Sequence, residues 1–222
     1  MPEQSLAVIG DVHGCAELLE TLLTRIEAQD HDAQLVFVGD MVDRGPGSQA
    51  VLARIRSLSR AVALRGNHEQ MMLGFLDEPE TIGASWLDYG GAQTLDSFGI
   101  TRHVADTQTR DALRNAMPAG LEDWLRSLPC WWRSGNVAVV HAGADPRSQI
   151  THQNPRDLIW GHPAFGRFPR RDGLWVVHGH TVVPKPRQSD GVISVDTGAW
   201  QGGGLSAALI STQGVEFLTI GR

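Results

Sequence analysis

Aspartate, histidine and asparagine side chains follow six short apolar segments of this sequence. They are Asp11 and His13, Asp40, Asn67 and His68, His141, His178 and His180, and Asp196. These side chains offer hard oxygen and borderline nitrogen ligands without a thiolate, a combination that suits Mn²⁺, Fe or Zn. A helix cap or a turn would explain any one of them, but that explanation does not extend to all six segments. The sequence therefore predicts a metal site.

The first third of the chain alternates between short apolar runs and helical patterns. The predicted strands cover residues 6–10, 35–39 and 61–66, and the predicted helices cover 15–28, 48–58 and 69–77. Such alternation with short loops is typical of a βαβαβ unit with neighbouring parallel strands. Ligands of open α/β sheets bind at the carboxyl ends of the strands, which is where the polar residues occur. Asp11 and His13 are two residues apart, so an extended strand end would point both to the same side.

The rest of the chain divides into a helical segment and a second group of strands. Residues 79–128 contain no convincing strand pattern, and we expect a mostly helical flank there. From Cys130 onward, apolar runs return, separated by connections rich in glycine and aspartate, which favours antiparallel pairing. We expect one α/β domain with a mixed sheet system flanked by helices.

Composition narrows the class of protein. A chain of 222 residues fits one domain with a real core. The formal net charge of −6 argues against nucleic acid as a partner, because phosphate-backbone binding needs a basic face. No apolar run is long enough to span a bilayer, and the first residues do not read as a signal peptide. Cys15 and Cys130 match no ligand spacing, so we expect reduced thiols and a cytoplasmic protein without membrane partners.

Three motifs occur in a fixed order: GDVHG at 10–14, GDMVDRG at 39–45 and RGNHE at 65–69. Together they resemble the motif set of the calcineurin-like metallophosphoesterase superfamily. The Val-Asp-Arg extension and the later HAG at 141–143 resemble its phosphoprotein phosphatase family, in particular the bacterial relatives of the bacteriophage lambda protein phosphatase. The resemblance runs from Gly10 to about Gly204. It implies a mixed β-sandwich flanked by helices (αββα) and a single catalytic domain over residues 1–222, with the helical flank at about 79–128.

The resemblance also implies a dinuclear metal centre. One ion would be held by Asp11, His13 and Asp40, and the other by Asp40, Asn67, His141 and His180. Asp40 would bridge two divalent ions, for which we expect Mn²⁺, with Fe and Zn as the other options. Two ions ~3.5–4 Å apart lower the pKa of a bridging water, so that hydroxide is available to attack the phosphorus directly.

Four further residues take roles by the same resemblance. His68 would be the general acid that protonates the leaving group, and Asp43 would orient it. Arg44 and Arg65 would clamp the phosphate oxygens, for which a planar guanidinium is well suited.

One position departs from the family pattern. Relatives supply another arginine shortly after an Ile-Trp pair, whereas here Ile159-Trp160 is followed by Gly161 and His162. His162, Arg167 and Arg170 are the alternatives for that phosphate contact.

The expected function is hydrolysis of phosphoserine and phosphothreonine, and also of phosphotyrosine, in proteins or small phosphoesters. The alternative is a symmetrical dinucleoside polyphosphate hydrolase, which shares these motifs but tends to read GNHD and often lacks the full VDRG. Glu69 and Asp43-Arg44 therefore favour the protein phosphatase. A third possibility, an inactive binding scaffold, is disfavoured because every expected metal ligand is present.

Several neighbouring residues have ordinary structural interpretations. Glu69 fits a helix start, where a carboxylate stabilises the helix dipole. Trp86 and Leu95 lie in a segment that resembles one bordering the substrate groove of bacterial relatives, and we expect them to pack in the core. His178 is expected to be structural, and Asp196 to orient a ligand histidine.

Overall fold

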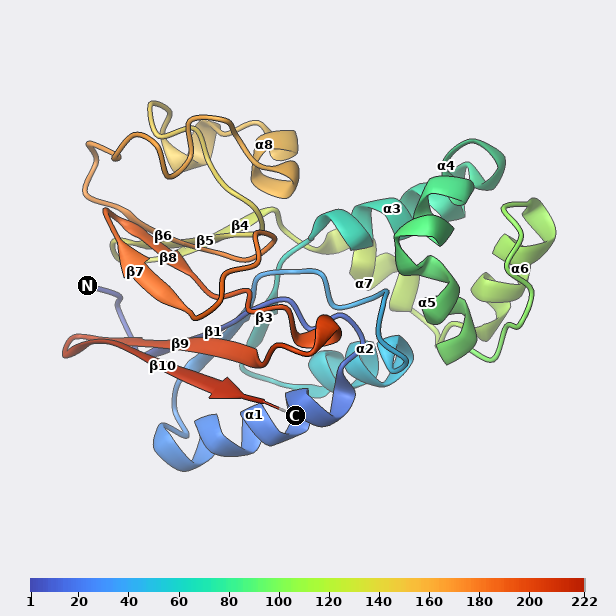
Figure 1. Cartoon of the computed structure of the whole chain (residues 1–222), viewed down its shortest axis with the longest axis horizontal. Coiled ribbons are helices and arrows are strands. Elements are labelled where there is room, and N and C mark those ends of the chain that lie inside the picture. The colour runs from blue at the N-terminus through green and yellow to red at the C-terminus, as the bar shows by residue number, and fades with distance from the viewer. Residues whose placement is uncertain (222) are drawn as a thin grey trace.

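Two five-stranded sheets stack face to face in the computed structural model, which describes residues 1–221 (Figure 1). The first sheet has the strand order β10-β9-β1-β2-β3. Its strands are β1 (Leu6–Ile9), β2 (Gln34–Phe37), β3 (Ala61–Ala63), β9 (Leu205–Ser211) and β10 (Gly214–Ile220). As predicted, β1, β2 and β3 are parallel, while β9 runs antiparallel to both β1 and β10.

The second sheet has the order β4-β5-β6-β8-β7. Its strands are β4 (Trp131–Ser134), β5 (Val137–Val140), β6 (Trp175–His178), β7 (Arg187–Ser189) and β8 (Val192–Ser194). The antiparallel prediction was wrong for β5–β6 and β6–β8, which are parallel pairs. The connection from β5 to β6 contains a 3₁₀ turn, η2 (Ile150–His152), and helix α8 (Pro155–Trp160). Such a crossover returns the chain in the same direction, which a hairpin cannot do.

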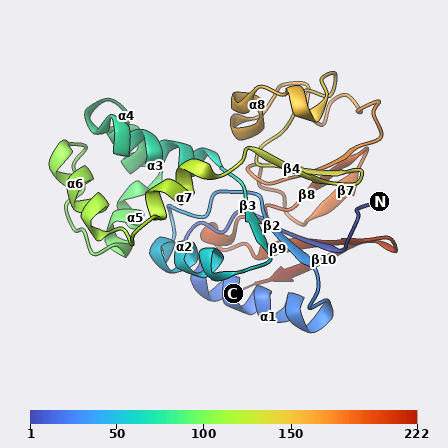
Figure 2. The ribbon, with the colours of Figure 1, turned by 180° about the vertical axis from the view of Figure 1, so that it is seen from behind.

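Helices cover the outer face of each sheet. Helices α1 (Ala16–Gln29) and α2 (Ser48–Ser57) lie against the first sheet, and α8 lies against the second (Figures 1 and 2). Alternate strand residues divide between the layers: Val8 and Val177 belong to the apolar cluster between the sheets, whereas Ile9 and Val176 belong to clusters under the helices. The predicted αββα sandwich is confirmed.

A group of helices lies beside the sandwich, at the right of Figure 1. It comprises α3 (Asn67–Asp77), α4 (Pro79–Trp86), the π-helical turn η1 (Leu87–Gly91), α5 (Ala92–Ser97), α6 (Thr107–Ala116) and α7 (Leu121–Ser127). Residues 79–128 contain no strand, as predicted. Trp86, Leu95 and Leu125 share one apolar cluster with residues of α1, α2 and the first sheet, so the flank is continuous with the main core.

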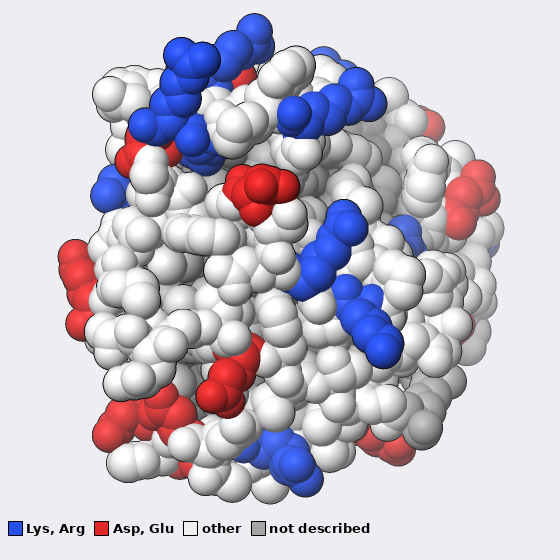
Figure 3. Space-filling model, turned by 60° about the vertical axis from the view of Figure 1, so that its left-hand side comes forward, with Lys and Arg blue, Asp and Glu red and all other residues white. Residues whose placement is uncertain are grey.

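The surface carries charge of both signs. On the face drawn in Figure 3, basic and acidic side chains are interspersed with uncharged surface. Among residues 1–221, every helix is too short or too polar to cross a bilayer.

Candidate active site

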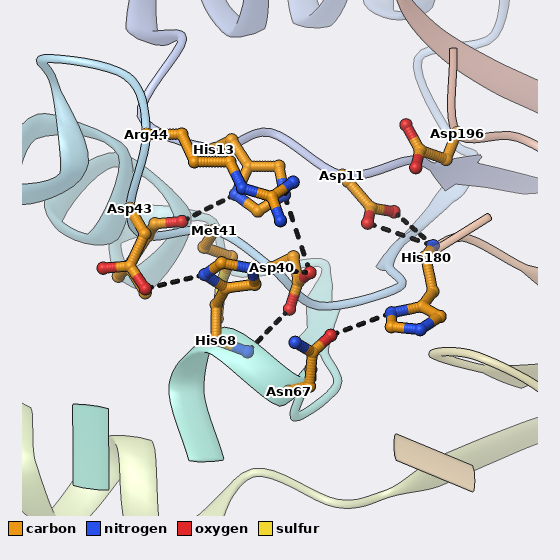
Figure 4. A network of polar contacts seen from close by, with 12 residues as sticks. Asp11, His13, Asp40, Met41, Asp43, Arg44, Asn67, His68, His180 and Asp196 are labelled. Carbon is orange, nitrogen blue, oxygen red and sulfur yellow. Dashed lines mark hydrogen bonds and ion pairs between the residues drawn. The ribbon is translucent and has the colours of Figure 1, made fainter. Parts of the chain in front are cut away.

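The candidate ligands lie on the loops that follow β1, β2, β5 and β6, and at the start of helix α3, which follows β3. Figure 4 shows Asp11, His13, Asp40, Asn67, His68 and His180 gathered in one place. The loops after β1 and β2 are joined, because the backbone N–H groups of Val12 and His13 donate to the carbonyl of Asp40 at 3.1 and 2.9 Å. Asp11 and His13 do not share an extended strand end as expected. Strand β1 stops at Ile9, and His13 has a φ of 44°, in the left-handed region. The turn, rather than strand pleating, directs these side chains.

Asp40 stands at the centre of the site. Its Oδ2 lies 3.6 Å from His13 Nε2 and 3.9 Å from His68 Nε2, and its Oδ1 lies 3.4 Å from His141 Nε2. Two groups of ligand atoms within 4.8 Å of one another share Asp40, one with His13 and His68 and one with His141 and His180. Burial alone would raise the pKa of Asp40, but the surrounding histidines, His141 and His68 above all, hold it well below its usual range.

Asn67 adds an amide oxygen to the second group. Its Oδ1 lies 2.9 Å from His141 Nε2 and 2.9 Å from His180 Nδ1. Asn67 opens helix α3, which follows β3, whereas both histidines come from loops of the second sheet. Side chains from the two sheets therefore converge on this oxygen.

Backbone carbonyls orient the buried histidine rings. His13 Nδ1 donates to Val42 O at 2.9 Å and His141 Nδ1 donates to Val38 O at 3.0 Å, because a carbonyl can only accept. The Nε2 atom of each ring is thereby left facing the site, which is the usual orientation of metal-binding histidines. Burial lowers the pKa of His13 to about 3, so this ring is neutral at pH 7 and available as a ligand.

His141 has a different electrostatic environment. Burial would lower its pKa, but the carboxylates of Asp40 and Asp11 outweigh burial and raise it to about 9. Its Nε2 is surrounded by oxygen atoms of Asp40 and Asn67, which favour a positive charge there. A divalent cation meets the same need as the proton.

Asp11 lies at the edge of the site, outside both groups formed by the described residues. Its two carboxylate oxygens accept from the backbone N–H of His180 at 3.1 and 3.0 Å. Burial raises the pKa of Asp11 well above its usual range, and Asp196 raises it further. This carboxylate would be stabilised by a nearby cation, and its role as a ligand remains a prediction.

Asp196 and His178 make contacts away from the ligand rings. Asp196 Oδ1 accepts from the backbone N–H of Gly198 at 2.9 Å, and the hydrogen bonds of the described residues include none from Asp196 to a ligand histidine. His178 donates to Gly179 O at 2.8 Å and lies 2.9 Å from Ser194 Oγ, so both ring nitrogens bond within the second sheet. The expectation of a structural role for His178 agrees with these contacts.

His68 and Asp43 form a buried pair. His68 Nδ1 lies 2.7 Å from Asp43 Oδ2, and both side chains are almost completely excluded from solvent. His68 Nε2 is buried and has no hydrogen-bond partner among the described residues. Burial would lower the pKa of His68, but the carboxylates of Asp40 and Asp43 raise it. Together these groups leave one nitrogen able to carry a proton toward the site.

Glu69 has a larger role than its helix-start position indicates. Its carboxylate is fully buried and accepts N–H groups from Asp40 at 2.8 Å, Met41 at 2.7 Å and Gly66 at 2.8 Å. It therefore fastens the loop after β2 to the start of α3. The RGNHE motif pointed to the position, and the bond to Gly66 is local. No local pattern could identify the other two partners, which are backbone groups 28 and 29 residues away.

The two predicted phosphate-binding arginines lie in different surroundings. Arg44 Nη1 donates to His13 Nε2 at 3.1 Å, and its guanidinium lies 4.7 Å from the ring centre of Trp200. The guanidinium of Arg65 instead bonds to the carbonyl of Arg126, at the end of α7, and lies 3.5 Å from Gln70 Oε1. The structure thus brings Arg44 to the centre, while Arg65 stays a prediction. Trp200 is a neighbour that the sequence did not single out.

The three residues considered for the further phosphate contact, which relatives make with an arginine, also differ in their surroundings. Arg170 donates to the carbonyls of Asp145 at 3.1 Å and Ser148 at 2.8 Å, which holds it in the crossover loop. Arg167 lines a cavity of about 540 Å³ together with Phe165, Phe168 and His178. His162 Nδ1 accepts from the backbone N–H of Ala164 at 3.2 Å. Of the three residues, Arg170 is the least available for a phosphate contact, because its guanidinium is bonded to two backbone carbonyls.

Known proteins resemble the chain along most of its length. It is 32% identical to serine/threonine-protein phosphatase 1 of Salmonella typhimurium, covering 91% of this chain and 90% of that protein. It is 29% identical to the asymmetrical bis(5'-nucleosyl)-tetraphosphatase PrpE of Oceanobacillus iheyensis, covering 90% of this chain and 86% of that one.

A solved structure shares the fold. The protein serine/threonine phosphatase of Saccharomyces cerevisiae superposes with a TM-score of 0.67 at 19% identity, covering 100% of this chain and 81% of the yeast chain. Residues 5–184 match the family described as calcineurin-like phosphoesterase. With these motifs, this sandwich and this cluster of ligands, the chain belongs to the calcineurin-like phosphoesterase family.

Proposed function

We propose that this phosphoesterase is a metal-dependent phosphomonoesterase that acts on phosphoserine and phosphothreonine in proteins, and also on phosphotyrosine. The observation that carries the proposal is the buried Asp43–His68 pair, whose free Nε2 faces the ligand cluster beside Arg44. A proton donor held in this way is needed when the leaving group is a strong base.

Two divalent ions fit the residues present. The donor set is made of carboxylate, amide and imidazole groups, and the raised pKa of His141 reflects a need for positive charge at its Nε2. The proposed ligands are Asp11, His13 and Asp40 for one ion, and Asp40, Asn67, His141 and His180 for the other. We propose Mn²⁺, although the same donors accept Fe or Zn. When bound, such ions supply an activated water and polarise the phosphoryl oxygens.

The chain's own side chains complete the site. The Arg44 guanidinium binds the phosphate oxygens, and its stacking on Trp200 limits its motion. Arg65 is proposed as a second phosphate contact, which would require it to leave the carbonyl of Arg126. His68 donates its Nε2 proton to the leaving oxygen as the P–O bond breaks, while Asp43 keeps hold of the Nδ1 proton.

The leaving group separates a protein phosphatase from a dinucleotide hydrolase. The alkoxide released from phosphoserine is a strong base and needs a proton as it departs. A nucleotide released from a polyphosphate leaves through a weakly basic phosphate oxygen, which needs no such help. The Asp43–His68 pair therefore favours monoester substrates with a basic leaving group.

A dinucleoside polyphosphate is the second candidate substrate. The likeness to the tetraphosphatase of O. iheyensis covers nearly as much of the chain as the likeness to the Salmonella phosphatase, at similar identity. The metal ligands and Arg44 would serve either reaction.

A direct comparison of substrates tests the proposal. Metal-stripped protein is reloaded with Mn²⁺ and assayed side by side on phosphoserine peptides, phosphotyrosine peptides and diadenosine tetraphosphate. We expect kcat/KM to be higher for a phosphopeptide. A value for the dinucleotide that is higher by orders of magnitude would replace the first candidate with the second.

A further inference from the structure

The helical flank reaches into the site through two side chains that hold Asp43. The Trp86 indole Nε1–H, at the end of α4, points at both carboxylate oxygens of Asp43, at 3.1 and 3.0 Å. The hydroxyl of Thr94, on α5, donates to Asp43 Oδ1 at 2.6 Å. Trp86, Thr94 and Asp43 are all completely buried. Because His68 bonds to Oδ2, each oxygen of this carboxylate has two hydrogen-bond partners.

The same segment holds the backbone of the turn. Asp43 and Arg44 have consecutive left-handed φ values of 71° and 69°, which are unfavourable for residues with side chains. The Asp43 N–H is held by Thr94 Oγ1 at 2.9 Å and by Ser48 Oγ at 3.0 Å, and the Arg44 N–H donates to Gly90 O at 3.2 Å. The flank therefore fixes both the carboxylate and the turn that carries it.

We propose that Trp86 and Thr94 are positioning residues for proton donation, which act by locking the Asp43 carboxylate in the orientation that aims His68 Nε2 at the leaving oxygen. This inference rests on the proposed role of His68 as the acid. Among the hydrogen bonds and ring contacts of the described residues, neither Trp86 nor Thr94 reaches the ligand cluster or the Arg44 guanidinium. Their bonds to Asp43 are therefore what connects them to His68.

The physical reason lies in the geometry of the carboxylate. A carboxylate with one partner can rotate about its Cα–Cβ and Cβ–Cγ bonds, and the imidazole bonded to it would follow. Donors on the other oxygen remove that freedom, because rotation would leave buried N–H and O–H groups unsatisfied, which is costly. Proton transfer depends steeply on distance and angle, so a looser His68 protonates the leaving oxygen less efficiently.

Thr94 offers a clean test, because its hydroxyl can be removed with little change in shape. In Thr94→Val the Asp43 N–H keeps Ser48 as its acceptor, so the turn retains a hydrogen bond while the carboxylate loses one. Thr94→Ser restores the hydroxyl. Ser97→Ala is the matched control, since it deletes another α5 hydroxyl, one bonded to Thr94 O and Gln49 N rather than to Asp43.

The readout is the dependence of rate on the leaving group. The Mn²⁺-loaded variants are assayed on p-nitrophenyl phosphate, whose leaving group is a weak base, and on phenyl phosphate, whose leaving group is more basic. For Thr94→Val we expect kcat on phenyl phosphate to fall about 10-fold, a fraction of the 10²–10⁴-fold that a general acid contributes. On p-nitrophenyl phosphate we expect a much smaller loss, with KM unchanged on both. Thr94→Ser should regain most of the rate.

Trp86→Phe provides a second, independent variant. It removes the indole donor and keeps an aromatic ring near Phe75, on which Trp86 is stacked at 4.7 Å. We expect the same selective loss on phenyl phosphate. A loss of stability alone would lower the rates on phenyl phosphate and p-nitrophenyl phosphate by the same factor. Melting curves of the variants measure that loss of stability.

The possible outcomes are distinct. Equal losses on the two substrates in Thr94→Val and Trp86→Phe, or a loss in Ser97→Ala as large as in Thr94→Val, would overturn the positioning role while leaving the phosphatase intact. Failure of the wild-type protein to hydrolyse either monoester would instead overturn the proposed function, and the inference with it.

Discussion

His68 can release a proton in one direction only, because its two ring nitrogens have different neighbours. Nδ1 is held by Asp43 at 2.7 Å, whereas Nε2 is buried beside Asp40 and His13 and has no hydrogen-bond partner within residues 1–221. A ring fixed by a carboxylate on one side and open on the other is suited to general acid catalysis. His68 could also bind a metal ion, since it belongs to one of the two groups of candidate ligands, with His13 and Asp40.

Replacement of His68 separates these two roles. We expect His68→Asn to lower kcat on a phosphoserine peptide by ~10²–10⁴-fold, because the leaving alkoxide loses its proton donor. The metal content of the purified variant, measured by inductively coupled plasma mass spectrometry, should stay at two ions per chain. His152→Asn, at an exposed surface position, is the control. Loss of one ion from His68→Asn would show that His68 is a ligand and would refute the acid assignment.

Glu69 illustrates a different kind of residue, which shapes the site without facing it. Its carboxylate accepts the N–H groups of Asp40, Met41 and Gly66, so it holds the central ligand loop in place. The motif made Asn67 and His68 predictable, because their chemistry is recognisable in the sequence. The assignment of Glu69 to a helix start agrees with its bond to the Gly66 N–H. Its other partners are backbone groups of another loop, which residue types do not reveal.

Glu69→Gln should therefore destabilise the protein more than its conservative size suggests. The new amide NH₂ cannot accept a hydrogen bond from the backbone N–H groups that it would face. At least one buried donor would then be left unsatisfied, which costs about 1–3 kcal/mol. Urea denaturation measures the loss in the free energy of unfolding. Glu80→Gln, on the exposed side of α4, should change it by less than about 0.5 kcal/mol. Equal effects of the two substitutions would mean that the Glu69 carboxylate does not hold the loop.

At the scale of elements, the helical flank links core packing to the site. Its helices were predictable from the lack of any strand pattern in residues 79–128. Their contacts with Asp43 were not, since Trp86 and Thr94 are 43 and 51 residues away from it in the chain. The approach of η1 to the loop after β2 depends on Gly90. This residue has a φ of 113°, and a Cβ there would lie 2.7 Å from the backbone nitrogen of Arg44.

Gly90→Ala should consequently displace the turn that carries Arg44. We expect KM for a phosphomonoester to rise by roughly 10–150-fold, which corresponds to the loss of one charge-assisted hydrogen bond worth about 1.5–3 kcal/mol. Gly99→Ala is the matched control, because Gly99 also has a positive φ, of 78°, but a Cβ there meets nothing within 4 Å. Both variants should lose stability through backbone strain. Only Gly90→Ala should change KM. An unchanged KM in this variant would mean that η1 does not position Arg44.

At the scale of the whole molecule, the candidate ligands come from both sheets. Asp40 and Asn67 follow strands of the first sheet, whereas His141 and His180 follow strands of the second. The convergence of loops was expected from the parallel β1–β2–β3 unit. The second sheet contributes in the same way because β5 and β6 are parallel too, so their carboxyl ends meet at one edge. The sequence suggested hairpins there, since glycine and aspartate punctuate crossover loops as well as tight turns.

Metal binding should accordingly tie the two sheets together and stabilise the whole chain. At 100 times the dissociation constant, an ion bound only by the folded state adds about 2.7 kcal/mol to the free energy of unfolding. For a chain of this size, each kcal/mol raises the melting temperature by roughly 2–4 °C. We therefore expect Mn²⁺ to raise the melting temperature of metal-stripped protein measurably, and excess EDTA to reverse the shift. His180→Ala removes a candidate ligand of the second sheet and should reduce the shift, whereas the exposed His152→Ala should leave it unchanged. A shift in His180→Ala equal to that of the wild type would mean that the second sheet does not share in holding the metal.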